Sequence, residues 1–434
     1  MIPYEVIKKK RDGKKLNKEE IEFMVMGYVN GEIPDYQMAA LLMAIFFQHL
    51  DDEERATLTE IMAKSGDMID LSDIGHKIVD KHSSGGVGDK TTLVVAPMVA
   101  SLGVPIAKMS GRALGHTGGT IDKLESIPGF ETSLSLEKFK ENVRKYGIAI
   151  AGQTANLAPA DKKIYALRDT TATVDEISLI SASIMSKKLA GGADAFVLDV
   201  KAGSGAFMKT IEDAIELAKA MVSIGKAHKK DTVALVTNME EPLGKFVGNS
   251  LEVLEAIETL KGNYDEKFFE LCLELSSYMV ELSGKMDREK AREELLKNIE
   301  NGKALEKFRD LVRAQGGNER VVDDPESILP ISEQTFDVKS TKSGFVKNID
   351  TEEIGVASIL LGAGRIKKGD KIDHSVGIKI LKKIGDKIEK GETIAVIYYS
   401  ERSNLDDAAK KILNAYEIGS EQTEKLPMIY EVIR

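Results

Sequence analysis

Apolar residues in the first part of the chain recur at helical spacing. They follow Asn17 three and four positions apart, as on one side of an α-helix, and Asn17 with Glu20 forms the residue pair of an N-terminal capping box. Two further helices are expected, one through the apolar stretch 38–47 and one after the acidic run 51–54, which favours the positive end of a helix dipole. We therefore predict a helical bundle over residues 1–70.

Short apolar runs alternate with helix-length segments beyond this bundle. The strand-like runs are 78–79, 105–109 and 148–151, and the helix-like segments between them are 93–101 and 136–146. The alternation resumes with buried strands at 195–200 and 232–237, and residues 265–314 are amphipathic and charged. Such a pattern predicts a parallel sheet that binds ligands at the carboxyl ends of its strands.

The pattern becomes β-rich from about residue 336. Strand candidates lie at 345–346, 377–380 and 393–399. Residues 383–393 resemble the strand and turn of a biotinyl- or lipoyl-type barrel, which raises the hypothesis of a non-catalytic carrier. No swinging lysine follows at a hairpin tip, so a structural cap is the favoured role.

The predicted fold class is α/β, or α+β in several domains. A helical domain of residues 1–70 is joined by 161–190, and an α/β lobe with a parallel sheet comprises 71–160 and 191–335. Residues 336–434 form a β-rich domain like a barrel-sandwich.

Composition excludes several classes of protein. The chain has 434 residues, of which 42% are hydrophobic and 30% charged, as in ordinary globular proteins. Its net charge of −10 argues against a nucleic-acid or anionic-membrane partner. Cys272 is the only cysteine, which fits a cytoplasmic location. No membrane segment is predicted, because 38–47 is too short and 93–107 is interrupted by Pro97 and Pro105.

A glycine-rich loop follows the strand at 78–79. Residues 81–92 combine three glycines within four positions with serine and threonine hydroxyls and two lysines. A strand, such a loop and a helix start together form a cradle for phosphate, because backbone N–H groups point at the anion. The spacing fits neither a Walker A motif nor a dinucleotide motif, and a tight turn without a ligand is the alternative.

A second loop of this kind follows the strand at 105–109. Two such loops at neighbouring strand ends can hold one phosphate from two sides. Four basic residues concentrate positive charge around the two loops of this acidic protein: Lys81, Lys90, Lys108 and Arg112. Asp122 and Glu125 are expected to organise the second loop.

Residues 110–125, Ser-Gly-Arg-Ala-Leu-Gly-His-Thr-Gly-Gly-Thr-Ile-Asp-Lys-Leu-Glu, resemble the fingerprint of the thymidine and pyrimidine-nucleoside phosphorylases. Residues 81–89 fit the same family, and the resemblance extends over the whole chain. It implies a pentosyltransferase that reversibly converts uridine, deoxyuridine and thymidine to the free base and (deoxy)ribose 1-phosphate in nucleoside salvage. Inorganic phosphate would be the co-substrate, no organic cofactor is implied, and relatives are homodimers.

The resemblance also implies roles for individual residues. The expected phosphate ligands are Lys81, His82, Ser83, Thr92, Lys108, Met109, Ser110 and Thr120. The expected groups at the leaving base are His82, Arg168, Ser183 and Lys187. Ser183 and Lys187 are four residues apart and share a helix face, whereas Lys188 would point about 100° away. His82 is expected to titrate near neutral pH and donate to the base, or to act only in positioning.

A potassium-like ion is the least direct implication of the resemblance. Its ligands would be main-chain carbonyls and one carboxylate, at Gly88, Lys90, Leu243, Phe246 and Glu255. Lys90 stands where a small hydroxyl residue is expected, so its ammonium would have to point away from the ion. The alternative is that Glu255 is an ordinary charge on a helix surface.

Two other enzymes remain as alternatives. One is a thymidine phosphorylase restricted to 2′-deoxynucleosides; Lys108 beside Ser110 resembles the branch with broad specificity instead. The other is a phosphoribosyltransferase of the anthranilate type, which needs a pyrophosphate and metal site built from acidic residues that these loops lack.

Overall fold

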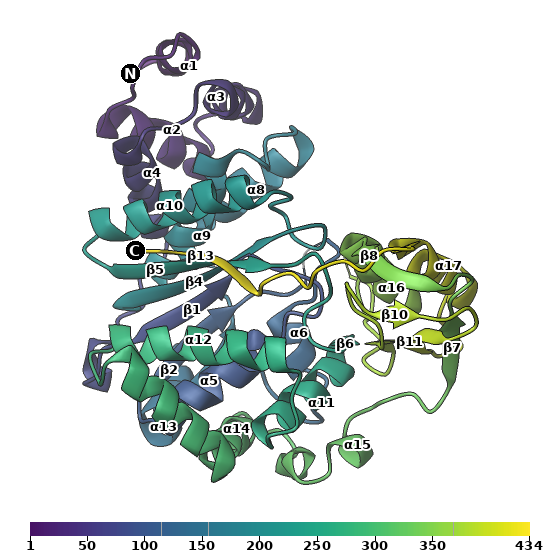
Figure 1. The fold of residues 1–434 in the computed structure, drawn as a ribbon. Helices are drawn as coiled ribbons and strands as arrows, with labels where there is room; N and C mark the ends of the chain where they lie inside the picture. Colours follow the sequence, from purple (N-terminus) through teal and green to yellow (C-terminus); the bar gives the residue numbers. More distant parts are fainter. Residues whose placement is uncertain (114, 155, 368) are drawn as a thin grey trace.

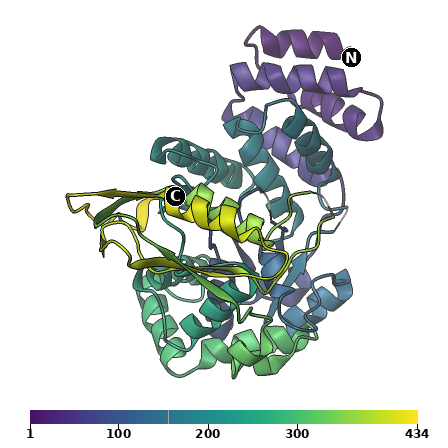
Figure 2. The same cartoon turned by 90° about the vertical axis from the view of Figure 1, so that its right-hand side faces the viewer.

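The computed structural model describes residues 1–113, 115–154, 156–367 and 369–434. Its N-terminal part is helical, as predicted: α1 (Pro3–Arg11), α2 (Lys18–Asn30), α3 (Asp35–Gln48) and α4 (Asp52–Lys64). The predicted capping box is present, since Glu20 N donates to Asn17 Oδ1 at 2.9 Å and Asn17 N donates to Glu20 Oε2 at 2.8 Å. These helices stand above the rest of the chain and apart from the C-terminal domain (Figure 2).

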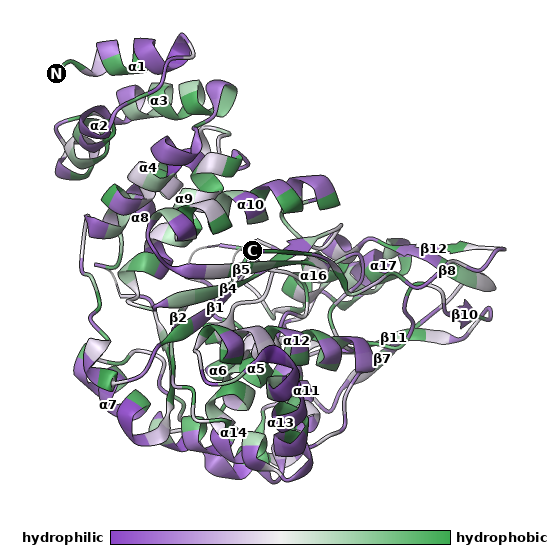
Figure 3. Ribbon diagram, turned by 60° about the vertical axis from the view of Figure 1, so that its left-hand side comes forward, coloured by the Kyte–Doolittle hydropathy of each residue, from purple (hydrophilic) through white to green (hydrophobic). Residues whose placement is uncertain are grey.

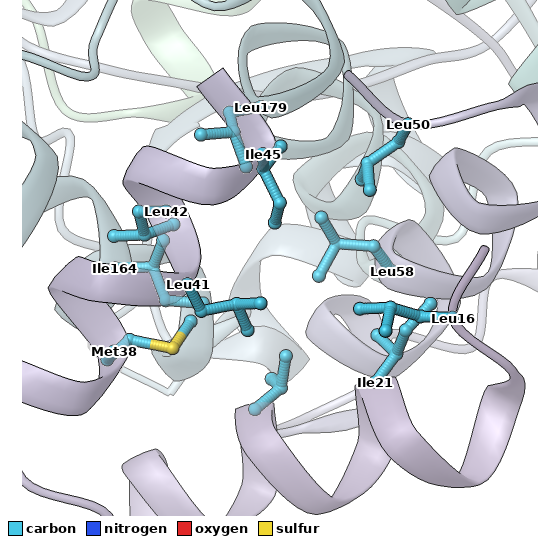
Figure 4. A pocket seen from close by; sticks show the side chains of 11 residues that line it. Leu16, Ile21, Met38, Leu41, Leu42, Ile45, Leu50, Leu58, Ile164 and Leu179 are labelled. Atoms are coloured by element: carbon cyan, nitrogen blue, oxygen red, sulfur yellow. The ribbon is translucent and has the colours of Figure 1, made fainter. Parts of the chain in front are cut away.

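Two later helices complete the core of this helical part, namely α8 (Pro159–Thr170) and α9 (Ile177–Ala190). Ile164 of α8 and Leu179 of α9 point into the same apolar space as Met38 and Leu41 of α3 (Figure 4). The space measures only about 20 Å³, so the side chains nearly fill it. Burial of these aliphatic groups attaches 159–190 to the N-terminal helices.

The central sheet has the order β1-β4-β5-β13, with β1 (Val79–Ser83), β4 (Ala195–Ala202), β5 (Asp231–Asn238) and β13 (Ile429–Ile433). The first three strands are parallel, and β13 pairs with β5 in the antiparallel direction. A separate parallel pair, β2 (Ile106–Ser110) with β3 (Ile148–Gly152), lies beside β1. The predicted parallel sheet is confirmed, but the return of the last residues to its edge was not predicted.

Helices cover both faces of this sheet (Figure 1). On one side lie α9 and α10 (Ile211–Ala227), and on the other α12 (Glu266–Leu282) with α5 (Thr91–Ser101) below it. Strand β4 is buried at every position between these layers, and Figure 3 shows largely hydrophilic helices such as α13 farther out. Both faces therefore need apolar residues, which explains the continuous apolar run at 195–198.

The remaining elements of the lobe connect or cover these layers. They are η1 (Ser72–Ile74), α6 (Thr120–Leu124), α7 (Leu136–Tyr146), α11 (Asn249–Leu260), α13 (Arg288–Glu300), α14 (Lys303–Ala314), η2 (Glu319–Val322) and α15 (Pro325–Ile328). The predicted helix at 136–146 is confirmed. The stretch 265–314 forms three helices, because Gly284 and Gly302 take φ values of 78° and 77° that end or precede a helix.

The described residues of the C-terminal part form two helices and most of two sheets, the second of which includes strand β6 (Phe246–Val247) from the α/β lobe. One sheet is β10 (Lys387–Ile388), β8 (Gly344–Ile349) and β12 (Tyr416–Gly419). The other is β6, β9 (Gly377–Ile380), β11 (Thr393–Tyr398) and β7 (Thr335–Lys339). The helices are α16 (Thr351–Leu361) and α17 (Leu405–Ala415).

The predicted β-rich domain is confirmed, although its described residues form no closed barrel. Strands β6 and β10 have only two residues each, too few to extend pairing around a barrel. No described helix is long and apolar enough to cross a membrane.

Candidate active site

A cavity of about 370 Å³ lies where the two glycine-rich loops face helices α8 and α9. It is lined by ten of the residues expected to bind phosphate or base: His82, Ser83, Thr92, Lys108, Met109, Ser110, Thr120, Arg168, Ser183 and Lys187. Lys81 is the one member of that set that does not line it. The topology explains why these residues lie around one cavity. Strands β1 and β2 end at the same edge of the lobe, and helices α8 and α9 lie opposite that edge.

The first loop leaves β1 at Ser83 and enters α5 at Thr91. Gly88 requires its glycine twice: its φ is 74°, and a Cβ there would lie 2.8 Å from the carbonyl oxygen of Leu243. The close turn brings Asp89 and Thr92 to the cavity wall.

The second loop leaves β2 at Ser110 and enters α6 at Thr120. A Cβ on Gly119 would lie 2.1 Å from Ala113 N, so only glycine fits. The Asp122 carboxylate accepts from Ala113 N and from Arg112, each at 2.8 Å, and from Arg365 at 2.9 Å. The prediction that Asp122 organises this loop is confirmed.

Arg112 contributes less free charge to the cavity than the sequence indicated. Its guanidinium donates to both oxygens of Glu125, at 2.6 and 2.8 Å, as well as to Asp122. Paired in this way, Arg112 fixes the loop rather than adding a net positive charge for phosphate.

Asp89 is a cavity residue that the sequence interpretation missed. It accepts hydrogen bonds from the Ser83 hydroxyl and, at 2.6 Å, from Thr91 Oγ1. Burial alone would raise the pKa of Asp89, but nearby ammonium groups, Lys81 first, hold it well below the usual range. An ionised carboxylate therefore orients the hydroxyls of the first loop. Its place inside the matched motif was the signal available in the sequence.

Lys81 lies behind the loop. Its Nζ donates to Thr91 Oγ1 at 2.5 Å and lies 3.4 Å from Asp199 Oδ2, and the side chain is buried. The hydrogen-bonded series Lys81, Thr91, Asp89 thus reaches the cavity wall. In this structure Lys81 acts on the cavity through its charge and through Thr91.

Asp80 is paired with two lysines that line the cavity. Lys188 Nζ donates to Asp80 at 2.7 Å, and Lys108 Nζ lies 3.4 Å from its other oxygen. Burial lowers the pKa of Lys108 to about 8; Asp80 opposes this shift, while Lys188 and Lys81 add to it. The expectation that Lys188 points away from the site is wrong, since it lines the cavity together with Lys187.

The prediction that His82 titrates near neutral pH is wrong. Burial, and then the positive charges of Lys188 and Lys108, lower the pKa of His82 well below its ordinary value. The imidazole is therefore neutral at pH 7, with one ring N–H that can be donated.

Ser183 and Lys187 share a face of α9, as predicted. Lys187 Nζ donates to Ser183 Oγ at 3.0 Å and to Asp161 Oδ2 at 2.5 Å. Asp161, at the start of α8, is the partner that the sequence interpretation missed. It fixes the ammonium at the cavity wall opposite the phosphate loops.

Arg168 is almost fully buried and binds the turn between α8 and α9. Its guanidinium donates to the main-chain carbonyls of Thr173 at 3.1 Å, Val174, and Leu179 at 3.2 Å. Guanidinium has five N–H donors, so two remain for a ligand in the cavity that Arg168 lines. Tyr165 and Phe207 also line the cavity, and neither was predicted.

The predicted cation ligands are brought together, but Lys90 does not behave as expected. Its ammonium points at the proposed ligands, donating to Leu243 O at 2.6 Å and to Glu255 Oε2 at 2.7 Å. The expectation that it points away is therefore wrong. Glu255 is buried rather than on a helix surface. These residues do not fit a potassium ion, because a protein cation already binds two of the five expected ligands.

Family comparisons agree with this architecture. A model of the glycosyl transferase family a/b domain matches residues 75–305, and one of its helical bundle domain matches 4–66. A model of the pyrimidine nucleoside phosphorylase C-terminal domain matches 345–419. Among solved structures, anthranilate phosphoribosyltransferase from Thermus thermophilus superimposes with a TM-score of 0.58 at 18% identity, covering 71% of this chain and 99% of that one. That likeness shows the fold alone.

Closer relatives cover almost the whole chain. Pyrimidine-nucleoside phosphorylase of Staphylococcus haemolyticus is 55% identical over 430 residues, which cover 99% of each chain. The enzyme of the same name from Bacillus subtilis is 56% identical over 418 residues, or 96% of each chain. With both loops and the opposing helices around one cavity, the chain belongs to the pyrimidine-nucleoside phosphorylase family of glycosyltransferases.

Proposed function

We propose that this protein catalyses the reversible phosphorolysis of uridine, deoxyuridine and thymidine in nucleoside salvage, with inorganic phosphate as co-substrate. The observation that carries the proposal is the single cavity bounded by two phosphate-type loops on one side and by Arg168, Ser183 and Lys187 on the other. A nucleoside placed across it would have its sugar between phosphate and the groups that receive the leaving base.

Phosphate supplies the attacking oxygen in such a reaction, so the protein needs no covalent nucleophile. The bond from C1′ to the base nitrogen breaks as the bond from C1′ to a phosphate oxygen forms, and the electron pair leaves with the base. Lys108 and Lys188, which both line the cavity, favour the phosphate anion. Correct placement of two reactants supplies much of the rate enhancement.

The leaving pyrimidine carries negative charge on its exocyclic oxygens. In the proposed mechanism Lys187 and Ser183 stabilise one of these oxygens, held in place by Asp161. The two remaining N–H groups of Arg168 donate to the base. His82 is neutral and donates its ring N–H to O2 as the base leaves.

The proposal includes a cytoplasmic homodimer formed through the helical domain. Met38, Leu41 and Ile45 of α3 are buried within the helical core. Tyr36 and Phe47 of the same helix remain 73% and 69% exposed. Exposed aromatic residues are typical of surfaces that bind another protein.

Uracil release from uridine, with and without phosphate, tests the proposed function. We expect release only when phosphate is present, and comparable use of deoxyuridine and thymidine. Activity on the two deoxynucleosides alone would favour the restricted thymidine phosphorylase. Release of uracil without phosphate would contradict phosphorolysis.

The pH dependence of phosphate use follows from Lys108. Its pKa of about 8 in the folded protein means that kcat/KM for phosphate is expected to fall as pH rises through about 8, because the ammonium loses its proton. In Lys108→Arg this loss should disappear, since guanidinium keeps its charge. Any effect of the titration of phosphate itself should be the same for the wild type and for Lys108→Arg. Identical profiles for the two proteins would contradict the role of Lys108.

The lowered pKa of Lys108 also makes the free energy of unfolding depend on pH. The pKa of Lys108 is lowered from 10.5 to about 8 by folding, so the unfolded chain binds more protons between these values. The contribution of Lys108 to the free energy of unfolding should therefore rise with pH across this window, and this rise should be absent in Lys108→Met.

A further inference from the structure

Lys90 ends the phosphate loop and sends its side chain away from the cavity into the protein. The side chain is fully buried, and its Nζ lies 2.6 Å from Leu243 O, 2.7 Å from Glu255 Oε2 and 5.2 Å from the centre of the Phe268 ring. All three partners attract a cation: a carbonyl dipole, a carboxylate and the face of an aromatic ring.

Glu255 has its remaining acceptors occupied by the turn that precedes it. Its Oε1 accepts from Lys245 N at 2.6 Å, and its Oε2 accepts from Phe246 N at 2.9 Å as well as from Lys90. Gly244 in this turn has a φ of 69°, and a Cβ there would lie 2.8 Å from Lys90 Nζ. The turn is therefore closed tightly around the ammonium group.

A free monovalent cation would compete for the same atoms. Main-chain carbonyls and a carboxylate replace the hydration shell of such an ion, but two of the expected oxygens already bind Lys90. A second positive charge beside a buried ammonium is repelled strongly at low dielectric. The Lys90 ammonium lies where the ion would lie, binds two of the same ligands and carries the same charge.

We propose that Lys90 is a covalently attached monovalent cation that replaces potassium in this protein. Its ammonium joins the phosphate loop to the turn at 243–246, which lies more than 150 residues later in the chain. The adjoining Gly88 is packed against the same turn, and Leu243 N donates to Val87 O at 3.0 Å. Lys90 is thus a positioning residue for Asp89 and Thr92, which line the cavity on either side of it in sequence.

The test compares melting temperature and phosphate kinetics in potassium chloride and in tetramethylammonium chloride at matched ionic strength. The wild-type protein is expected to show the same Tm and the same phosphate KM in both salts. A higher Tm or a lower phosphate KM in potassium alone would overturn the proposal. This comparison needs no variant, so it stands even if substitutions impair folding.

Substitution of Lys90 should create the potassium dependence that the wild type lacks. In tetramethylammonium, Lys90→Ala is expected to lower Tm by about 5 °C and to raise the phosphate KM at least about tenfold, because Glu255 loses its buried partner. Potassium or ammonium ions should restore both quantities in part and saturably, since alanine leaves room for an ion. Lys90→Met fills that room without charge, so it should be impaired but not restored.

Lys245→Ala is the matched control, because Lys245 is exposed on the same turn and only its main-chain N–H binds Glu255. It is expected to match the wild type in every salt. An unchanged Lys90→Ala, or equal restoration of Lys90→Met, would contradict the proposal. The phosphate KM rests on the proposed function, but the Tm does not. A Tm that depends on potassium in Lys90→Ala but not in the wild type, without any phosphorolysis by either protein, would therefore retain the cation role and reject the enzymatic one.

Discussion

Lys187→Ala is expected to lower kcat/KM for uridine at least about 10²-fold, the scale of losing one preorganised donor to developing charge. The ammonium lies at the cavity wall, fixed by Asp161 and Ser183. A neutral side chain there would leave the departing pyrimidine without the cation that Asp161 and Ser183 hold at the cavity wall. Most of the loss should appear in kcat, because the charge develops only in the transition state.

The Lys187→Ala protein should fold, but with a lower Tm than the wild type. The nearly buried carboxylate of Asp161 would lose its ammonium partner. Lys162→Ala serves as the matched control, since Lys162 is the exposed neighbour of Asp161 on the same helix. It should retain wild-type kinetics. Normal uridine kinetics in a folded Lys187→Ala protein would remove Lys187 from the site.

Lys81→Met is expected to lower kcat/KM for phosphate by about 10²-fold and to leave the uridine KM nearly unchanged. Lys81 does not line the cavity, so the effect acts through two connections. It removes the hydrogen bond to Thr91, and it removes the largest positive influence on Asp89, whose pKa should then rise. The hydroxyls that Asp89 orients would lose their arrangement.

The structure also predicts why Lys81→Met should fold. Asp199 would keep two partners, Lys201 Nζ at 2.8 Å and Thr237 Oγ1 at 2.6 Å, so no buried carboxylate is left alone. Lys77→Met, which changes a partly exposed lysine just before β1 that is paired with Asp231 rather than with the loop, is the matched control. Unchanged phosphate kinetics in Lys81→Met, measured at saturating uridine, would contradict the assignment of the first loop.

Periodicity was sufficient to predict most elements of the fold. The capping pair at Asn17 and Glu20, the helix at 136–146 and the parallel strands are local features, because each depends on residues near one another in sequence. The pairing of β13 with β5 joins residues almost 200 positions apart. No short-range pattern encodes such a partner, and the two-residue strands β6 and β10 were too short to detect.

In the candidate site, too, local features could be predicted from the sequence and long-range partners could not. The two glycine-rich loops and the pair Ser183 and Lys187 could be found in the sequence, because spacing and motif determine them. The carboxylates that fix these groups could not. Asp161 lies 26 residues from Lys187, and Asp80 lies 108 residues from Lys188. Such partners are chosen by the tertiary fold, which also sets the burial that lowers the pKa of His82.

The direction of the Lys90 side chain is the clearest example. The sequence indicated only that lysine was unusual at this position. Its burial against Phe268 and its bonds to Leu243 and Glu255 depend on segments more than 150 residues away. The motif alone therefore does not determine where the side chain at position 90 points.

Stoichiometry tests the central claim most directly. Uracil formed from uridine and inorganic phosphate consumed would be measured in the same samples over time. Our account predicts that the two amounts remain equal, that ribose 1-phosphate accumulates with them, and that adding uracil and ribose 1-phosphate re-forms uridine. Uracil formation without loss of phosphate, or formation that requires pyrophosphate instead, would contradict it.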